Sequence, residues 1–522
     1  MKKSQSQKSP RRSAPSARNG RAPARSGPGQ TRRSGGEHMR APQQRQAHPL
    51  EGQTIALTID TLALGGAGVA RMPEGLEGLE TGAGMAVFVS GGLPGAAVEA
   101  RITRVHRRHA EAVVTGVRTP SPEAVEPLCP HFETCGGCPL QTLAPARQLY
   151  WKERQILEAL RRIGRVEPQR VLPALPAPKV TGFRNKMEFA FQSAGQGPDA
   201  LRLGLYSKAD PGRVFDLEAC AIFPQDGCDM VDAVRQACRD AGLPAYDRRT
   251  GLGLLRHLVL RHSVHQDRYL AQLITAPVPA DSAPALALFS LGAALMERFP
   301  KLAGFVHAER DKADGLAVSE RTVLALGESA LVETLEDVRY SISADAFFQT
   351  CTGGALGLYS GLRELADLGP DDVVFDLYCG GGGIALFLAA HTGRVLGLEA
   401  NPSAVADAEA NAKLNKVDNC RFLRADLTGE SAVPERLPEG FAKADVVVVD
   451  PPREGLDNGL IAWLNRTRPS RLAYVSCNPA TLARDAGLLA GEGGGFALSA
   501  VRAVDLFPHT AHAECLALFT PK

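Results

Sequence analysis

Apolar and polar positions change their spacing along the chain, and the first pattern is an alternation broken by glycines. The stretches GGAG at 65–68 and GGLPG at 91–95 separate short alternating runs. These runs cover 54–59, 86–89, 98–105 and 110–117. A period of two with glycine turns is typical of a small antiparallel barrel. We therefore predict an OB-like β-barrel over 51–118.

The spacing then lengthens. Residues 143–163 have the periodicity of one amphipathic helix, and Gly164 is available to end it. The next part, 119–345 as a whole, is predicted to be a mixed α/β domain without an assigned topology. Its strand-like runs are 187–192, 254–261 and 269–274.

From residue 346 onward, short apolar runs alternate with helical patterns, which predicts a doubly wound, Rossmann-like parallel sheet over 346–522. The runs are 373–377, 394–399, 420–423, 445–449 and 471–475. Two last runs, 496–505 and 514–519, are predicted to form a terminal hairpin. The fold class is therefore α/β, with the β-barrel at its N-terminal side.

Charge is uneven along the chain. Residues 1–50 hold twelve Lys or Arg and one acid, Glu37, which is a net +11. The remaining 47 basic and 56 acidic residues give the rest about −9. Few large apolar residues occur in the tail, so we predict that it is disordered. It is either a phosphate-binding arm or a solubilising segment, and a transit peptide is a further alternative.

The eleven cysteines are too sparse for a disulfide scaffold, which indicates a reducing compartment and metal or catalytic use. Because no apolar run approaches the roughly 20 residues of a membrane span, we expect a cytoplasmic protein without membrane contact.

A glycine turn follows the first strand of the C-terminal domain, in VVFDLYCGGGGI at 373–384. Such a turn lets the backbone approach a ligand at the carboxyl end of a strand. The spacing does not fit the dinucleotide fingerprint, so S-adenosylmethionine is favoured over a nicotinamide cofactor. Asp376 precedes the turn, and Glu399 and Asp426 end the next two strands, where a ribose and an adenine edge would lie.

Two further strand ends carry reactive groups, Asp450 in DPPREG and Cys477 in SCNP. A thiol at a strand tip faces the ligand crevice. Methylation of carbon 5 of uracil is one reaction that needs such a thiol. That carbon can attack a methyl sulfonium only after a thiolate has added to carbon 6. Methylation of an amino group needs no covalent step, so the cysteine argues against that alternative.

These segments together resemble the RNA (uracil-5-)-methyltransferase family over roughly 51–522. The resemblance is carried by FRNKMEF at 183–189, SADAFFQ at 343–349, DLYCG at 376–380, DPPREG at 450–455, SCNP at 476–479 and LFPHTAHAE at 506–514. Residues 51–118 also resemble a TRAM domain, an RNA-binding module.

The resemblance implies that Cys477 is the nucleophile and Glu514 the base that removes the carbon 5 proton. It further implies a cofactor and uridine cleft lined by Gln349, Tyr378, Gly383, Glu399, Asp426 and Asp450. Members of the family often have a polar residue where this chain has Gly383, so only a backbone contact is expected there.

Cysteines also cluster before the predicted helix, in Cys129-x5-Cys135-x2-Cys138. Their spacing alone suits zinc or an iron–sulfur cluster equally. The resemblance implies a [4Fe–4S] cluster with Cys220, in DLEACAIFP, as the fourth ligand; Cys228 and Cys238 are the rivals. We expect a structural or RNA-positioning role for it.

The same branch of the family indicates 23S rRNA as the substrate and a monomeric enzyme. Methylation of tRNA, or an RNA-binding or chaperone protein without activity, are the alternatives. Arg184, Asn185 and Lys186, with Arg256, His257 and Arg261, are candidates for an RNA surface on which Phe183 could stack a base. Equally, they could be strand residues with solvated charges.

Overall fold

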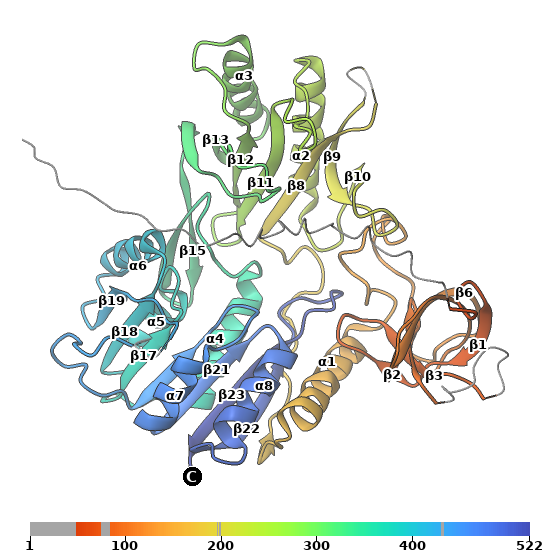
Figure 1. The fold of residues 1–522 in the computed structure, drawn as a ribbon. Helices are drawn as coiled ribbons and strands as arrows, with labels where there is room; N and C mark the ends of the chain where they lie inside the picture. The colour runs from red at the N-terminus through yellow and green to blue at the C-terminus, as the bar shows by residue number, and fades with distance from the viewer. Residues whose placement is uncertain (1–47, 75–83, 196, 198–199, 430–432) are drawn as a thin grey trace, which may run out of the picture. The chain divides into compact units, whose positions relative to one another are not determined.

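A computed structural model of the chain describes residues 48–74, 84–195, 197, 200–429 and 433–522 (Figure 1). Almost all of the predicted tail 1–50 lies outside these ranges. Within the described residues the strands form four sheets, and helices pack on the two largest. The domain boundaries proposed from the sequence stay predictions.

The first sheet is built from the alternating runs near the N-terminus. Its strand order is β1-β5-β6-β4-β3-β2, and it curls into the predicted barrel (Figure 1). The strands are β1 (Thr54–Thr58), β2 (Thr61–Leu62), β3 (Gly68–Arg71), β4 (Ala86–Ser90), β5 (Ala97–Val105) and β6 (His109–Thr119). The two glycine stretches meet inside it, because a Cβ on Gly68 would lie 2.7 Å from the carbonyl oxygen of Gly92.

The predicted helix over 143–163 is confirmed as α1 (Pro145–Ala159), which continues into a π-helical turn, η1 (Leu160–Gly164). The helical turn ends at Gly164. A glycine is needed there because the backbone of Ala483 leaves no space for a side chain. The next residue, Arg165, takes the left-handed conformation that turns the chain.

The central part forms a sheet in the order β10-β9-β8-β11-β12-β13-β14. Its helices are α2 (Gln225–Asp240) and α3 (Ala283–Arg298), whose apolar faces share one core with the sheet. The strands are β8 (Lys186–Ser193), β9 (Leu201–Tyr206), β10 (Val214–Asp216), β11 (Leu255–Ser263), β12 (Arg268–Thr275), β13 (Leu302–Glu309) and β14 (Arg321–Gly327). A separate hairpin follows, formed by β15 (Ala330–Leu335) and β16 (Val338–Ser343).

The C-terminal sheet has the order β19-β18-β17-β20-β21-β23-β22-β7. It contains β7 (Arg170–Val171), β17 (Val373–Leu377), β18 (Arg394–Glu399), β19 (Cys420–Arg424), β20 (Val446–Val449), β21 (Arg471–Ser476), β22 (Phe496–Val504) and β23 (Glu514–Pro521). Strands β17 to β21 are parallel, and β22 and β23 form the predicted antiparallel hairpin. The unpredicted edge strand β7 comes from the central region.

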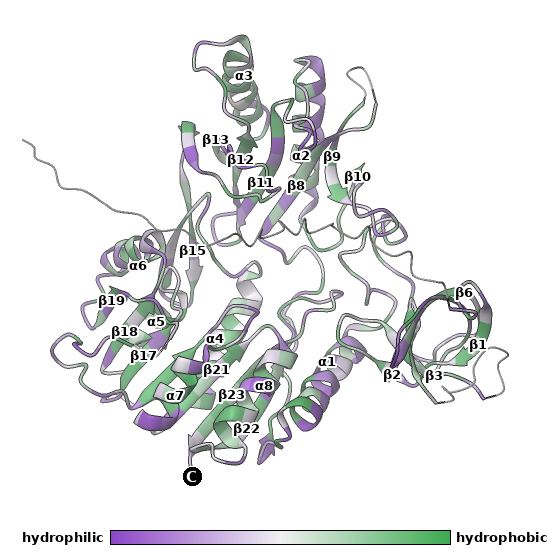
Figure 2. Cartoon of the chain, in the orientation of Figure 1, coloured by the Kyte–Doolittle hydropathy of each residue, from purple (hydrophilic) through white to green (hydrophobic). Residues whose placement is uncertain are grey.

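Helices cover both faces of this sheet, which confirms the doubly wound prediction. One face packs against α4 (Thr352–Ala366), α5 (Gly383–Ala389) and α6 (Pro402–Asn415). The other packs against α1, α7 (Asn458–Thr467) and α8 (Pro479–Ala490). Strands buried on both faces need continuous apolar sequence, and Figure 2 shows them in hydrophobic colours beside mixed helices.

Candidate active site

The parallel strands end at one edge of the C-terminal sheet, and the chain order reverses there between β17 and β20. Such a switch point opens a crevice for ligands at the carboxyl ends of the strands. Tyr378, Glu399, Asp450 and Cys477 each lie at or directly after the end of one of these strands. The predicted candidates therefore meet at the same edge.

Strand register aligns the two candidate catalytic groups. Strand β23 pairs antiparallel with β21, and Ser476 lies opposite Cys515. Continuing this register by one residue would set Cys477 opposite Glu514, and the Glu514 carboxyl group lies close enough to act on the Cys477 thiol. The register therefore brings a thiol and a carboxyl group from positions 37 apart in sequence to neighbouring places on the sheet.

The Cys477 thiol is half-buried. Burial, together with the nearby acids Glu514 and Asp450, raises its pKa to about 11, and the charge of Arg453 opposes this shift. The following residue, Asn478, caps α8 and donates a hydrogen bond to the backbone oxygen of Arg453 at 3.0 Å. This bond links the cysteine segment to the DPPR turn.

Two acids border this thiol. Glu514 is only 6% exposed, and burial followed by the charge of Asp450 raises its pKa to about 8, against the lowering effect of Lys152 and Arg453. Burial also raises the pKa of Asp450 to about 7. Carboxyl groups with raised pKa values can exchange protons near neutral pH, which suits acid–base chemistry.

Helix α1 holds the loop that leads to Glu514. The buried Lys152 ammonium donates to the Asp505 carboxylate at 2.7 Å and to the backbone oxygen of Phe507 at 2.9 Å. Gln148 accepts from the backbone N–H of His509 at 2.6 Å, and Leu140 donates to its carbonyl at 2.9 Å. These bonds hold residues 505–509, the first part of the loop that leads to β23.

The candidate cofactor residues lie around the glycine turn. Tyr378 has the left-handed φ of 67°, which lets the chain turn sharply after β17. Glu399 accepts hydrogen bonds from the backbone N–H groups of Gly380 and Asn401 at 3.1 and 2.8 Å. Its carboxylate is therefore held at the turn. Asp426 is exposed, and its carboxylate accepts a bond from the Thr428 hydroxyl at 2.8 Å.

Asp376, beneath the turn, is fully buried, and neither of its carboxyl oxygens has a hydrogen-bond partner among the described residues. Burial and the charge of Asp450 raise its pKa well above the usual range. Only the backbone N–H of Ala385 acts against this rise. A buried acid without a close partner takes up a proton, so Asp376 is neutral at neutral pH unless a cation is bound nearby.

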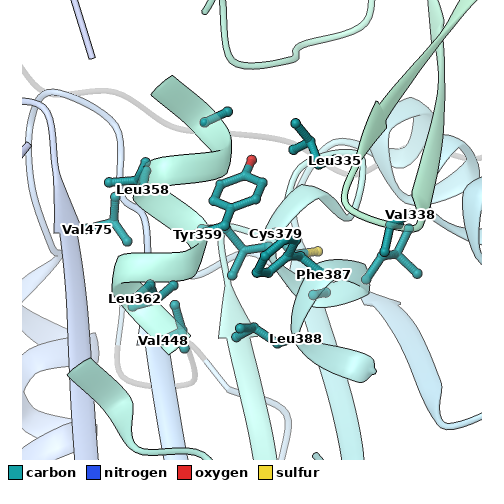
Figure 3. Close-up of a cluster of buried hydrophobic side chains, with 14 of the residues drawn as sticks. Leu335, Val338, Leu358, Tyr359, Leu362, Cys379, Phe387, Leu388, Val448 and Val475 are labelled. Atoms are coloured by element: carbon teal, nitrogen blue, oxygen red, sulfur yellow. The ribbon is translucent and has the colours of Figure 1, made fainter. Parts of the chain in front are cut away.

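Gly383 begins α5 and is closely covered. The Tyr340 hydroxyl donates to its carbonyl oxygen at 2.9 Å. A Cβ on this glycine would lie 2.7 Å from the hydroxyl oxygen of Tyr359. Figure 3 shows Tyr359 in the apolar cluster beside α5. The neighbouring tyrosine thus takes the space of a side chain at 383.

The suggested RNA surface around FRNK is not supported by the structure. Phe183 is 5% exposed and packs in the core, so it cannot stack on an incoming base. Asn185 is buried and donates to the backbone oxygen of Gln349 and to Thr352, both at 2.9 Å. Arg261 is buried and donates to the backbone oxygen of Ala344 at 3.0 Å.

Arg256 and His257 are buried as well, and Arg184 and Lys186 are half-buried. Neither an RNA-facing patch nor a set of solvated charges describes this group. The sequence showed these polar residues but not the direction of their side chains. Asn185 and Arg261 donate hydrogen bonds to the segment 344–352. That segment carries Gln349, which is half-buried beside the crevice.

The cysteine segment docks on the central sheet. Cys135 pairs with Ser207 in an isolated bridge, and the Gln141 side chain accepts from the backbone N–H of Cys129 at 3.0 Å. Burial raises the pKa of Cys135, Cys138 and Cys220, and the nearby thiols raise them further. The four predicted ligands are thus near one another and half-buried.

These thiols are not gathered as tightly as one metal ion requires. In the described part of the chain, the only three potential ligand atoms within 4.8 Å of one another belong to His106, His109 and Glu111. Sulfurs that share one zinc ion lie within about 4.6 Å. The arrangement of the four cysteines therefore does not match a single-ion site.

Similarity to known proteins identifies the kind of enzyme. The sequence profile of the tRNA (Uracil-5-)-methyltransferase family matches residues 316–522, and that of the TRAM domain matches 50–115. An uncharacterized RNA methyltransferase of Nitratidesulfovibrio vulgaris is 39% identical over 469 residues, which are 89% of this chain and 96% of that protein. The chain belongs to the RNA (uracil-5-)-methyltransferase family.

Another relative of this methyltransferase, from Chlorobaculum tepidum, is 36% identical over 84% of this chain and 92% of that protein. The crystal structure of Pyrococcus abyssi tRNA (uracil-54, C5)-methyltransferase, in complex with S-adenosyl-L-homocysteine, superposes with a TM-score of 0.67 and 25% identity. It covers 89% of this chain and 100% of that one. The predicted enzyme class, methyltransferase fold and TRAM domain are confirmed. Among the described residues, no helix combines the length and the apolar character needed to span a bilayer.

Sequence reasoning about this RNA (uracil-5-)-methyltransferase missed several polar groups of the site. Lys152 and Tyr359 became visible only when distant segments met, and Arg453, although part of DPPREG, was given no role. The exposed aromatic Phe347, 73% accessible and two residues before Gln349, could have been singled out within SADAFFQ. An exposed aromatic beside a predicted cofactor residue is a signal for base stacking.

Proposed function

We propose that this methyltransferase uses S-adenosylmethionine to methylate carbon 5 of a uridine in 23S rRNA through a covalent Cys477 adduct. The observation that carries the proposal is that the β21–β23 register, which ends at Ser476 and Cys515, leads Cys477 and the buried Glu514 from neighbouring strands to the same end of the sheet, within electrostatic range of each other and of Asp450. A nucleophile and a proton acceptor on neighbouring strands are what this reaction needs.

The crevice fits S-adenosylmethionine on two counts. The unpartnered Asp376 carboxyl would gain from a nearby cation, and the glycine turn admits a close backbone approach. Glu399 and Asp426 would bind the ribose and the adenine, with Gln349, Tyr378, Gly383 and Asp450 completing the cleft. When bound, the cofactor supplies the methyl group.

The reaction begins when the Cys477 thiolate adds to carbon 6 of the uracil. The electron pair of the 5,6 double bond moves onto carbon 5 and oxygen 4. Carbon 5 would then bond to the methyl carbon while the bond from that carbon to the sulfonium sulfur breaks, which leaves S-adenosylhomocysteine. Glu514, as the carboxylate, removes the proton from carbon 5. The carbon 6–sulfur bond breaks, the double bond returns, and the thiolate is released.

Because the pKa of the Cys477 thiol is raised, the substrate complex must favour its thiolate form. The pKa of Cys477 lies near 11, so the neutral thiol dominates at neutral pH, and Arg453 is the cation that favours the thiolate. Phe347 is exposed where a flipped uracil could stack. We infer that Arg453 assists the thiolate while Phe347 holds the base.

The TRAM domain supports an RNA substrate. Strand β5 and the turn that follows it present exposed arginines to solvent: Arg101, Arg104, Arg107 and Arg108. Such a cluster suits contacts with phosphates, which position an RNA without reading its bases. The net charge of residues 51–522, about −9, does not indicate this basic cluster.

We further propose that Cys129, Cys135, Cys138 and Cys220 hold a [4Fe–4S] cluster. A cluster of several atoms spans a wider set of thiolates than one zinc ion, so the lack of a tight thiol group among the described residues does not conflict with it. Arg184 and Lys208 lie within electrostatic reach of these thiols and would balance an anionic cluster. Methyl transfer consumes no electron, so the cluster would hold the segment between the TRAM domain and the base loop.

Substrate choice separates two versions of the proposal. The cysteine motif favours 23S rRNA, whereas the similar Pyrococcus abyssi enzyme modifies uracil 54 of tRNA. Sequencing of 5-methyluridine in total RNA from a strain lacking the gene should show one or more unmodified 23S rRNA positions. Restoration by the wild-type gene but not by Cys477→Ala is expected.

Loss confined to tRNA would replace the rRNA assignment with the alternative. An unchanged modification map, together with purified protein inactive on both RNAs, would leave an RNA-binding role without catalysis.

A further inference from the structure

Tyr359 places a hydroxyl group in the crevice without a partner. The side chain comes from α4 and is 4% exposed. Its ring packs among apolar side chains that include Phe387, and Figure 3 shows the hydroxyl at the edge of this cluster, pointing away from Leu362 and Leu388. The hydroxyl forms no hydrogen bond with the described residues, although buried tyrosine hydroxyls usually find one.

The surroundings of this hydroxyl are acidic. Asp376 and Asp450 both lie within electrostatic range of Tyr359, as does the Tyr340 hydroxyl group. Asp376 is fully buried, with both carboxyl oxygens unpartnered. Asp376 and Asp450 therefore lie close enough to act on the Tyr359 hydroxyl, and both acids would gain from a nearby cation.

Gly383 is what leaves room for this hydroxyl. A Cβ there would lie 2.7 Å from the Tyr359 hydroxyl oxygen but 3.6 Å from the ring carbon that bears it. The first distance requires something to move, whereas the second is an ordinary contact. A side chain at 383 and a hydroxyl on 359 are therefore mutually exclusive.

We propose that the Tyr359 hydroxyl, which occupies the place of the missing side chain at Gly383, binds the ammonium group at the methionine end of S-adenosylmethionine. This inference rests on the proposed function, because it presupposes a cofactor site over β17 and β20. Tyr359 is then a cofactor-binding residue, with Asp376 and Asp450 supplying the negative field and the tyrosine oxygen accepting one N–H.

Calorimetric binding to the full chain tests the contact with two ligands. S-adenosylhomocysteine carries the amino acid end, and 5′-deoxy-5′-methylthioadenosine lacks it. Tyr359→Phe should weaken S-adenosylhomocysteine by about tenfold, the loss of one hydrogen bond to a charged group. Its affinity for 5′-deoxy-5′-methylthioadenosine should stay at the wild-type value.

The glycine supplies a matched variant. Gly383→Ala alone should displace the hydroxyl and weaken S-adenosylhomocysteine by a similar factor. In the Tyr359→Phe background the added methyl group has room, so the double variant should bind as the single Tyr359→Phe does. Additive losses would contradict the shared space.

A third ligand separates the contribution of the ammonium group from that of the carboxylate. S-adenosyl-3-thiopropylamine keeps the amine and lacks the carboxylate, so Tyr359→Phe should weaken it as much as S-adenosylhomocysteine. Unchanged affinity for this amine would overturn the ammonium assignment. Equal loss for all ligands, or none for any, would overturn the inference as a whole. Failure of the wild-type chain to bind S-adenosylhomocysteine would instead refute the proposed function.

Discussion

Cysteines occupy two regions of this enzyme that are built in different ways. Cys477 follows directly after a strand, and the β21–β23 register fixes the residue opposite it. Cys129, Cys135 and Cys138 lie in a segment without helix or strand, held to distant residues by single backbone and side-chain bonds. A strand tip can place one reactive group by itself, whereas loop thiols depend on a shared ligand to bring them together.

The electrostatics of the two regions differ in the same sense. Burial raises the pKa of Cys477 to about 11 and that of Cys138 to about 12. Around Cys477 the further upward shift comes from two acids, while around Cys138 it comes from other thiols. The acids around Cys477 can exchange a proton with its thiol. The thiols around Cys138 would instead be deprotonated when a metal binds.

The largest effect is expected from Glu514→Gln. The amide keeps the shape of the side chain but cannot accept the carbon 5 proton, so the adduct should form and then persist. Turnover should fall by about 10²–10⁴-fold, and RNA should migrate with the protein on a denaturing gel. Cys477→Ala is the control and should give no adduct. Normal turnover in Glu514→Gln would contradict the base assignment.

The cysteine segment 129–138 is tested by removing two of its proposed cluster ligands. Cys135→Ala with Cys138→Ala should abolish bound iron after anaerobic purification. Methylation should fall by about 10–100-fold, as for residues that orient an active-site group from outside, because Leu140 and Gln148 anchor the loop before Glu514. Iron content and melting temperature measure the loss.

Cys238→Ala is the matched control, since this buried thiol was a rival ligand in the sequence. It should retain its iron. Zinc in place of iron in the wild-type chain would contradict the cluster and would require the four thiols to close around one ion.

Prediction from the sequence succeeded where periodicity alone decides the structure. Runs such as 373–377 and 394–399 became strands with the predicted bounds, because continuous apolar residues fit only a sheet covered on both faces. Strand β7 was missed since two exposed residues, Arg170 and Val171, carry no hydrophobic signal.

The RNA surface around FRNK failed for a different reason. Charge in the sequence does not show direction, and Asn185 and Arg261 turned out to satisfy backbone oxygens of the 344–352 segment. Likewise Lys152 and Asp505 lie 353 positions apart, so only the fold joins them. Motif matching located the strand ends of the site but not the groups that tune them.

Lys152→Met should shift the pH dependence of the reaction. Lys152 lowers the pKa of Glu514, against burial and Asp450, which raise it to about 8. The base must be ionised, so activity rises with pH through this pKa, and loss of the ammonium moves the rise about one unit higher. Adduct breakdown at pH 7 should slow by about tenfold and recover at high pH.

The charged groups around Glu514 are Asp450, Arg453, Lys152 and the Cys477 thiol. Single-turnover measurements separate their effects, since adduct formation depends on Cys477 and adduct breakdown on Glu514. A Lys152→Met enzyme that slows both steps equally at every pH would indicate a structural role for Lys152 alone.

The smallest effect is expected from Arg453→Gln. This residue is exposed, and its charge lowers the pKa of Cys477. Without it, adduct formation below that pKa should slow by about two- to fivefold, as for other exposed charge pairs. Because water and salt screen an exposed cation, the difference from wild type should shrink as ionic strength rises. The Lys152→Met defect, arising from a buried ammonium, should persist at the same salt concentrations. Two cations that act on neighbouring groups would thus be distinguished by their burial, and an Arg453→Gln defect that is independent of salt would place this side chain in direct contact with the reacting thiol.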